Sequence, residues 1–451
     1  MDSNIWLRRV MVTLLVGAMF HGLLAFVIFA EMPQTEDGPS YRAQALNILD
    51  GRQSYFFFPP GTALAAVPLY AVFGDSLTTD HLVATIFWIA FSIACAWLAW
   101  LMCDSKKTAW IATLFAAMLP HGLLATGTIS SQPLTAALLA SSICLGILSY
   151  RKGSLTLWTA AAALLAFAVL VRPATLAVSS TVMLLLIWAA WKHHISVARG
   201  VSSGTLLVVV HAMFLLPVMN HNASQGQGYS VSTNNEWNLL VGNNPYTPNY
   251  KTGHFGQRTF DKVDVDARAY LSAFLPHQQP ANATFSERQQ MRSEAIEYIV
   301  DHPLQFLYRV SNRFRGFWGM DYTASRELQN AYGLGITQTG VLLLLEGGGF
   351  IFVLLLSLLY YVRTGLDTRN TLTYIFLAAS IAPYLLAFSV AKYHTVVLPV
   401  LFPLAAQAIV WITSKEERQM MLAHRPKRLL IMLLIVAVIQ MEHVYHIVDN
   451  R

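Results

Sequence analysis

Charged residues are scarce in this sequence, making up only 12% of its 451 residues. A soluble globular protein carries about 25% charged residues. Hydrophobic residues reach 55%, and the mean hydropathy is +0.47. This composition excludes a soluble globular domain and indicates an integral membrane protein.

The sequence also lacks the alternation of apolar and polar residues over about 10 positions that marks strands of a membrane β-barrel. Its apolar runs instead reach the ~18–20 residues that a helix needs to cross a bilayer. The net charge of +6 comes from Lys and Arg spread through short loops, so no nucleic-acid partner is expected. We therefore predict an all-α polytopic membrane protein.

Cysteine is nearly absent. Cys95, Cys103 and Cys144 lie in or at the edge of apolar segments, in no metal-binding pattern and no disulfide framework. We interpret them as small core residues. The first apolar run follows Arg8-Arg9 as in a signal peptide, but it is long and lacks a small-residue cleavage site. We expect it to be retained as the first helix.

Apolar length and flanking charge predict about 11 transmembrane helices. The expected ranges are 10–30, 78–102, 109–126, 133–150, 155–171, 174–191, 201–219, 339–362, 371–390, 394–413 and 428–446. With a cytoplasmic N-terminus, every cytoplasmic loop is basic, as the positive-inside rule requires. We expect a multi-pass protein of the inner (plasma) membrane, with Arg172 and Lys392 left near span ends on the outer side.

Two outer segments, 31–77 and 220–338, are much longer than turns, and catalytic machinery is expected there. We predict an N-terminal transmembrane module (1–219) that includes the first of these loops. A periplasmic subdomain of mixed α/β structure (220–338) follows, because its beginning is rich in Asn and Gly and is typical of turns and short strands. A C-terminal transmembrane module (339–451) completes the chain.

The first outer loop contains "EDGPSYRAQALNILDG". Asp37 or Gly38 suits the N-cap of a short amphipathic helix, Pro39 its first turn and Gly51 its C-cap. The "FFFPPG" that follows predicts a rigid, non-helical turn. Asp37 is either a helix cap or a carboxylate that works at the membrane surface, and the two roles are compatible. Glu36 beside it is either a metal or acceptor contact or a solvated neighbour.

Two helices are predicted in the second outer segment. Ser286 and Gln289 have the spacing of a capping box for the first of them. The second follows a His-Pro pair and carries Arg309, Arg313 and Arg315 away from its apolar face. It is either a surface helix packed on the membrane part or one whose arginines meet anionic headgroups or a lipid phosphate.

Several motifs occur in a characteristic order: "EDGPSYRAQALNILDG", "FFFPPG", "SSQPL", "VLVRPATL", "NLLVGNNP", the His-Pro helix and "AKYHTVVLPVLFP". This set resembles the polyprenyl-phosphate-sugar-dependent glycosyltransferases of the GT-C class. The nearest branch groups the protein mannosyltransferases with the lipid A aminoarabinose transferases (family 39-like). The resemblance covers residues 10–413. Phe58 stands where many relatives have Lys, Gln132 where an acid is common, and Lys392 with His394 where an Arg pair is usual.

The resemblance implies a membrane glycosyltransferase that moves a sugar, with inversion, from a polyprenyl-phosphate donor to an acceptor on the outer face. Asp37 would act as the base beside Glu36. Arg172 and Lys392 would hold the leaving phosphate, because cations stabilise the charge that develops on it. His394 would add a hydrogen-bond donor. The acceptor is a lipid, a glycan or a protein.

The resemblance also implies a set of substrate-binding residues. They are Tyr41, Gln132, Arg172, Trp237, Asn243, Lys392, Tyr393 and His394. Structural alternatives stay open: a snorkelling Arg172, a helix-end anchor at Lys392, a structural His394, and interface aromatics at Trp237 and Tyr393. His121, in a short outer loop, is a weaker candidate. No metal is predicted to be required, although a divalent metal shared by the adjacent acids stays open.

Other functions compete with this one. A lipid-linked polysaccharide polymerase or ligase would also have many spans and a large outer loop. A lipid or glycan transporter (flippase) would carry charges deep inside its spans and often inverted repeats. Glu346, beside Gly347, is a charge within the eighth apolar run and has no evident partner in the sequence. A non-catalytic membrane scaffold is the third alternative.

Overall fold

The computed structural model of this chain describes residues 2–250, 263–274, 280–365, 368–416 and 426–449, and all regular secondary structure in these ranges is helical. The all-α prediction is therefore confirmed. The short strands expected early in the segment 220–338 do not occur in its described residues. That segment forms helices α11 (Asn235–Gly242), α12 (Val265–Ser272), α13 (Phe285–Asp301), α14 (Pro303–Phe317) and α15 (Thr323–Tyr332).

Eight helical segments of the described chain are long and apolar enough to cross a bilayer. They are α1–η1 (Asn4–Ile28), α4 (Leu77–Met102), α5–α6–η2 (Lys106–Gly127), α7 (Ser131–Lys152), η3–α9 (Pro173–Trp191), α10 (Val197–Ser224), α16 (Ile336–Thr364) and η7–α18 (Ala391–Thr413). The chain is thus a multi-pass membrane protein, as predicted.

The other three expected spans fall on helices whose apolar parts are shorter. These helices are α8 (Leu155–Val171), α17 (Thr368–Leu386) and α20 (Pro426–Asp449). The total of 11 transmembrane helices therefore stays a prediction. One apolar helix was not expected: α3 (Gly61–Phe73) begins directly after the Pro-Pro turn.

The membrane core is built around α4, α5, α7, α16 and α18, which pack against one another. Small residues such as Ala99, Ala112 and Ala405 are fully buried where these helices meet, and small side chains let helix backbones approach closely in lipid. Cys95 and Cys144 are buried in the same core, and all three cysteines are free. Their interpretation as small structural residues is consistent with this packing.

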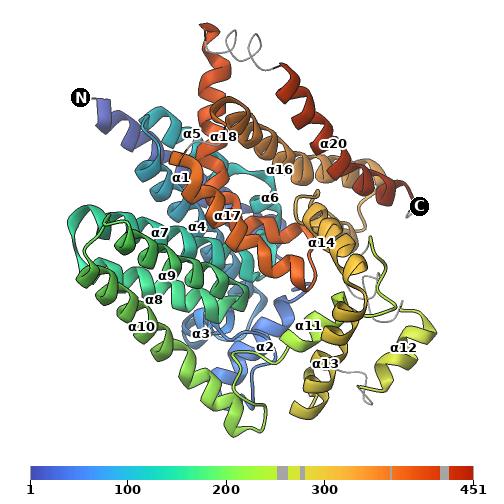
Figure 1. The fold of residues 1–451 in the computed structure, drawn as a ribbon. Coiled ribbons are helices and arrows are strands. Elements are labelled where there is room, and N and C mark those ends of the chain that lie inside the picture. Colours follow the sequence, from blue (N-terminus) through green and yellow to red (C-terminus); the bar gives the residue numbers. More distant parts are fainter. Residues whose placement is uncertain (1, 251–262, 275–279, 366–367, 417–425, 450–451) are drawn as a thin grey trace.

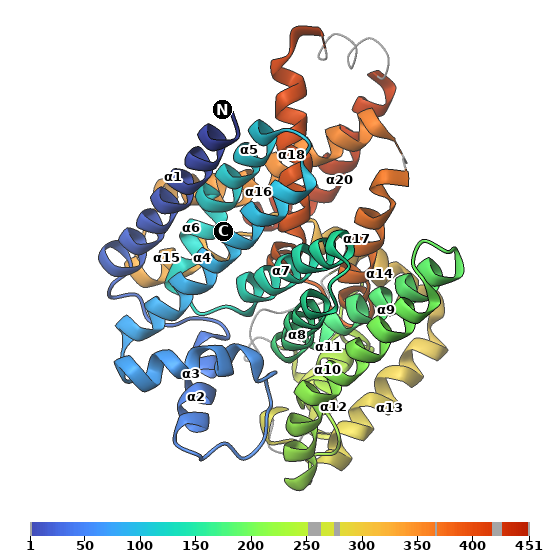
Figure 2. The same cartoon turned by 90° about the vertical axis from the view of Figure 1, so that its left-hand side faces the viewer.

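Several helices from the two long connecting segments gather at one end of the long apolar helices. In both views α2 (Gly38–Leu49), α3, α12 and α13 lie at the lower end, whereas the chain begins at the opposite end (Figures 1 and 2). The first loop and the segment 220–338 therefore share one face, as a common site for them requires.

Helix α2 starts as predicted, with Asp37 at the N-cap and Pro39 in the first turn. The Asp37 side chain makes no capping hydrogen bond, so it remains available for other partners. Tyr41 and Ala45 are buried, and Gly51 follows the helix with a φ of 66°, a left-handed conformation that glycine adopts readily.

The capping box of α13 differs from the prediction. Thr284, rather than Ser286, accepts the N–H of Glu287, and the Glu287 carboxylate accepts the N–H of Thr284 at 2.7 Å. Both pairs have the required spacing, but the earlier pair also places an acid in the first helical turn, where the helix dipole favours it.

Close contact between α3 and α8 depends on Gly61. A Cβ at this position would lie 2.4 Å from the backbone nitrogen of Val171. We expect Gly61→Ala to force the two helices apart, lower stability by about 1–3 kcal/mol and reduce the thermal midpoint by a few degrees in detergent.

Gly22→Ala is the matched control, because a Cβ there meets nothing within 4 Å. Thermal unfolding of both purified variants checks this expectation. An unchanged midpoint for Gly61→Ala would contradict the close helix crossing.

Candidate functional site

The acids of the first loop meet a cation from the other end of the sequence. Lys392 lies in η7 (Ala391–Val397), and its Nζ is 2.8 Å from Glu36 Oε2 and 3.9 Å from Asp37 Oδ2. The structure thus brings together three of the predicted site residues. Lys392 is 20% exposed, so its charge is directed mainly at protein groups and not at the bilayer surface.

Glu36 has an unusual backbone. Its φ is +52°, in the left-handed region that non-glycine residues occupy at some energetic cost. Burial raises the pKa of Glu36, and the opposing effect of the Lys392 ammonium is smaller. The strained backbone turns the chain just before α2 and places Glu36 and Asp37 on the same side as Lys392.

Arg172 is the second predicted cation, and it sits where α8 ends before Pro173. Its Nε donates to the Tyr384 hydroxyl at 3.1 Å and its Nη1 to Ser131 Oγ at 2.9 Å. The guanidinium lies 4.4 Å from the ring centre of Tyr393. These partners all belong to the protein, which favours a fixed cation over a snorkelling one.

Tyr41 links this cation to the acids. Burial raises the pKa of Tyr41, nearby Asp37 raises it further, and the positive charges of Arg172 and Lys392 oppose the rise. The phenol therefore stays protonated and can donate a hydrogen bond. Tyr393 packs against Tyr384 with ring centres 4.6 Å apart. Tyr41, Arg172, Lys392 and Tyr393 thus form one neighbourhood around Asp37.

A small cavity of about 50 Å³ lies beside this neighbourhood. Gln132, at the start of α7, and Lys392 line it, together with His121, Asp321, Glu346 and Thr395. One water needs about 10–15 Å³ of such cavity volume. The cavity therefore has room for a few waters or an ion. It is too small for a whole sugar-lipid.

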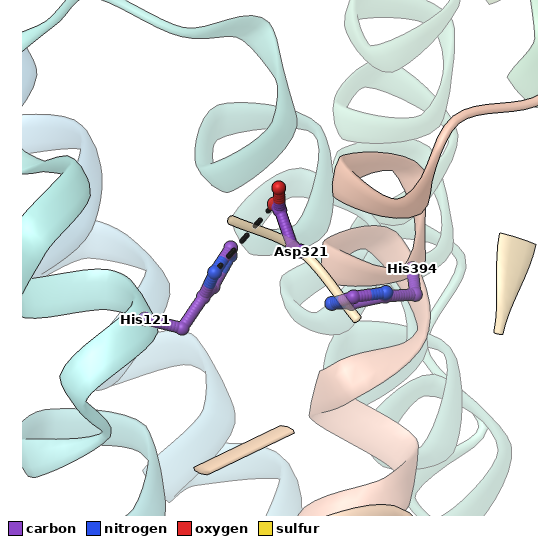
Figure 3. Close-up of side chains that lie close together, drawn as sticks. All are labelled: His121, Asp321 and His394. Carbon is purple, nitrogen blue, oxygen red and sulfur yellow. Dashed lines mark ion pairs between the residues drawn. The ribbon is translucent and has the colours of Figure 1, made fainter. Parts of the chain in front are cut away.

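Three buried side chains lie close together next to the cavity, His121, Asp321 and His394 (Figure 3), and the first two of them line it. One ligating atom from each lies within 4.8 Å of the other two. His121 comes from α6 (Pro120–Leu124), Asp321 from the segment after α14, and His394 from η7. Within the described residues, this is the group whose ligating atoms lie close enough together to hold a metal.

The carboxylates at this cluster have specific partners. Asp321 Oδ1 accepts the N–H of Thr323 at 3.0 Å, and Oδ2 lies 3.7 Å from His121 Nδ1. Burial alone would raise the pKa of Asp321, but the charges of His121 and His394 and the Thr323 hydrogen bond hold it below its ordinary value.

Glu346 is not an isolated charge, contrary to its appearance in the sequence. Its two oxygens accept the backbone N–H groups of Ala324 at 3.0 Å and Ser325 at 2.7 Å. These donors belong to the first turn of α15, where unpaired N–H groups favour an anion. The partner that was not evident in the sequence is therefore the start of α15.

Two predicted substrate residues lie in the extramembrane helices and do not line the cavity. Trp237 packs with α12 and α13 in a separate hydrophobic cluster. Asn243, at the end of α11, donates to the Leu386 carbonyl at 3.0 Å and accepts from Arg313 at 3.0 Å. The structure gives both residues packing roles and leaves their predicted substrate contacts as predictions.

Arg309 and Arg313 are fully buried, so these two do not reach lipid headgroups, whereas the half-buried Arg315 leaves that alternative open for itself. Arg313 donates to the carbonyls of Leu385 at 2.9 Å and Leu386 at 3.0 Å, and Arg309 donates to the carbonyl of Thr247. They satisfy backbone oxygens where α11, α14 and α17 meet. Helical spacing placed both arginines off the apolar face of α14. It could not show that residues of two other segments cover the side of the helix on which the arginines lie.

Asp321 was missed by sequence reasoning, and His121 was ranked low. The sequence around Asp321 gives no signal of this role, because the residues that it meets are far away in the chain. A weak sign was present for His121: "LPHG" breaks an apolar run, and a polar residue at such a break is unusual in lipid.

No family model matches the chain, and no curated protein sequence matches it. Solved structures do resemble it. The oligosaccharyltransferase of Archaeoglobus fulgidus in its apo form matches with a TM-score of 0.51 and 13% identity, over 98% of this chain and 55% of that one. ArnT from Cupriavidus metallidurans, bound to undecaprenyl phosphate, matches with a TM-score of 0.40 and 13% identity, over 90% of this chain and 77% of that one.

The chain spans about half the length of the oligosaccharyltransferase it resembles. The likeness to this enzyme shows that the chain has a GT-C fold, as the ordered motifs predicted.

Proposed function

We propose that this chain is a membrane glycosyltransferase that moves a sugar from a polyprenyl-phosphate donor to an acceptor on the outer face of the membrane. One observation carries the proposal: on a GT-C fold, Asp37 lies beside Lys392 at 3.9 Å, in the same neighbourhood as the fixed Arg172. A carboxylate next to two cations is the arrangement that transfer from a phosphate leaving group needs.

Asp37 takes the part of the base in this proposal. Its carboxylate is not used as a helix cap, and its side chain is 44% exposed, so an acceptor can reach it. Attack of the acceptor oxygen or nitrogen on the anomeric carbon forms the new bond, and the proton passes to Asp37. The C–O bond to the phosphate breaks on the opposite side of the sugar, which inverts the configuration.

Arg172 and Lys392 take the parts of phosphate ligands. The bond electrons leave with the polyprenyl phosphate, whose charge rises as the bond breaks, and fixed cations stabilise that charge. Arg172 is held by Tyr384 and Ser131 before any donor arrives. Such preorganisation avoids the free-energy cost of ordering the side chain during the reaction.

Glu36 positions Lys392 between the proposed base, Asp37, and the place of the leaving phosphate. Their 2.8 Å ion pair fixes the ammonium next to Asp37. Lys392 then lies where it can attract the phosphate while staying close to the base. Glu36 thus has a positioning role, and the proton transfer belongs to Asp37.

We expect Asp37→Asn to abolish sugar transfer while the protein still folds, because the amide cannot accept the acceptor's proton. The matched control is Asp50→Asn, since Asp50 is an exposed carboxylate that closes the same helix and pairs with Arg52. Mass spectrometry of envelope lipids and glycans, from cells lacking the gene and supplied with each variant, measures the product. Wild-type product levels with Asp37→Asn would refute the base assignment.

We expect Arg172→Gln to raise the donor concentration for half-maximal rate by about 10- to 100-fold, the equivalent of losing one charged hydrogen bond. Arg52→Gln serves as the control, because Arg52 is 70% exposed and pairs with Asp50.

The measurement is the release of polyprenyl phosphate from synthetic lipid-linked sugars by membranes that contain each variant. Thermal midpoints must be recorded alongside, since Arg172 also holds Tyr384. If the donor concentration for half-maximal rate stayed unchanged, Arg172 would have a structural role only. Transport of labelled lipid with no covalent product would instead support the flippase alternative.

A further inference from the structure

His121, Asp321 and His394 point toward one another from three segments that are far apart in the sequence (Figure 3). All three are at most 3% exposed, and their ligating atoms lie within 4.8 Å of one another. Two imidazoles and one carboxylate are a ligand set that first-row transition metals favour, zinc among them. Buried polar groups need partners, and one nitrogen of His121 has none for a hydrogen bond.

The hydrogen bonds of His121 fix which nitrogen faces the cluster. Its Nε2 lies 3.1 Å from the Thr395 hydroxyl, whereas its Nδ1 is buried and has no hydrogen-bond partner. Carboxylate oxygens of Asp321 and Glu346 lie 3.7 Å and 3.9 Å from this Nδ1, too far for hydrogen bonds. A metal ligated by Nδ1 would satisfy it, with Thr395 orienting the ring from behind.

The ring of His394 is also fixed from one side. Its Nδ1 lies 3.3 Å from the Phe317 carbonyl, which only accepts hydrogen bonds, so Nδ1 carries the proton and the lone pair sits on Nε2. The ring stacks on Phe350 with centres 3.4 Å apart and planes 4° apart. A backbone carbonyl behind a fixed imidazole is a usual outer partner of a metal ligand.

The charges also favour a cation. Among the described residues, Asp321 and Glu346 form no ion pair with Lys or Arg, and the nearest groups able to carry positive charge are histidines. Asp321 keeps Oδ2 toward His121, because Oδ1 accepts the Thr323 N–H. Glu346 is held by the first turn of α15 and has an oxygen 3.9 Å from His121 Nδ1, and it is not required as a ligand.

We propose that His121, Asp321 and His394 bind a divalent transition metal, zinc by the nature of the ligand set. An open coordination position would face the cavity that Gln132 and Lys392 also line. Zinc bonds of about 2.0–2.2 Å require the three ligating atoms to move closer by roughly 1 Å. The site is distinct from Asp37 and Glu36, and the proposal stands whether or not the chain transfers sugars.

The open position gives the metal a chemical use. The cavity has room for a few waters and opens beside Lys392, whose ammonium sits next to the proposed base. A metal with three protein ligands binds an anionic oxygen or a water in its fourth position. The ligand class expected there is therefore a phosphate oxygen or an acceptor oxygen.

Metal analysis of the full-length protein tests the site directly. The protein is purified in detergent without chelators or a histidine tag, and its metal content is measured by inductively coupled plasma mass spectrometry. We expect about one zinc per chain, the stoichiometry of a three-ligand site, and a loss to background in His121→Gln and in Asp321→Asn. His211→Gln is the matched control, because His211 is also buried and hydrogen-bonded but has no carboxylate beside it.

A second measurement guards against variants that fold poorly. Wild-type protein is stripped with a chelator and titrated with zinc chloride alone while its thermal midpoint is followed. Binding to the folded state must raise the midpoint, in wild type and His211→Gln but not in His121→Gln. Wild-type protein that holds no metal and shows no zinc-dependent shift would overturn the proposal, as would full zinc content in His121→Gln.

Discussion

The ammonium group of Lys392 lies 2.8 Å from the Glu36 carboxylate, and this ion pair joins the first loop to the last part of the membrane core. Other contacts of the loop lead elsewhere: Gln34 and Thr35 hydrogen-bond to residues 127–129, and Arg42 pairs with Asp75 and Asp80. The Asp37 side chain makes no capping bond. The position of the two acids relative to η7 therefore depends on the Lys392 contact.

Breaks in the membrane helices explain why so many functional side chains occur there. A helix that stops within a membrane protein leaves backbone groups that lipid cannot satisfy, so protein groups must do so. Arg313 binds the carbonyls of Leu385 and Leu386 where α17 ends, and His394 faces the Phe317 carbonyl where α14 ends. Arg172 and His121 sit at two further breaks, each next to a proline. The irregular backbone at these breaks needs polar partners, and the same segments line the site.

Short-range sequence signals were sufficient to predict the features that depend only on neighbouring residues. The N-cap at Asp37, the helix up to Leu49 and the long apolar helices follow from composition, capping and proline placement. The Lys392–Glu36 pair could be anticipated only through the ordered motifs, because the sequence around each residue does not indicate which residue it pairs with. Asp321 could not be found at all: its role comes from helices packing around it, and sequence spacing carries no information about that packing. Arg309 and Arg313 fail for the same reason, since burial by distant segments overrode a polar helix face.

The charges around the cavity connect the two proposed sites. Three carboxylates line it, those of Asp321, Glu327 and Glu346, and Lys392 supplies the ammonium group. Asp321 is held ionised, because its neighbours keep its pKa below the ordinary value, and its negative charge would repel an approaching lipid phosphate. Within the described part of the chain, the Lys392 ammonium lies near Glu36 and Asp37 and forms no ion pair with Asp321. A divalent cation between His121, Asp321 and His394 would offset the Asp321 charge and leave Arg172 and Lys392 free to attract the phosphate. The proposed metal would thus make it easier for an anionic donor to bind beside these two cations.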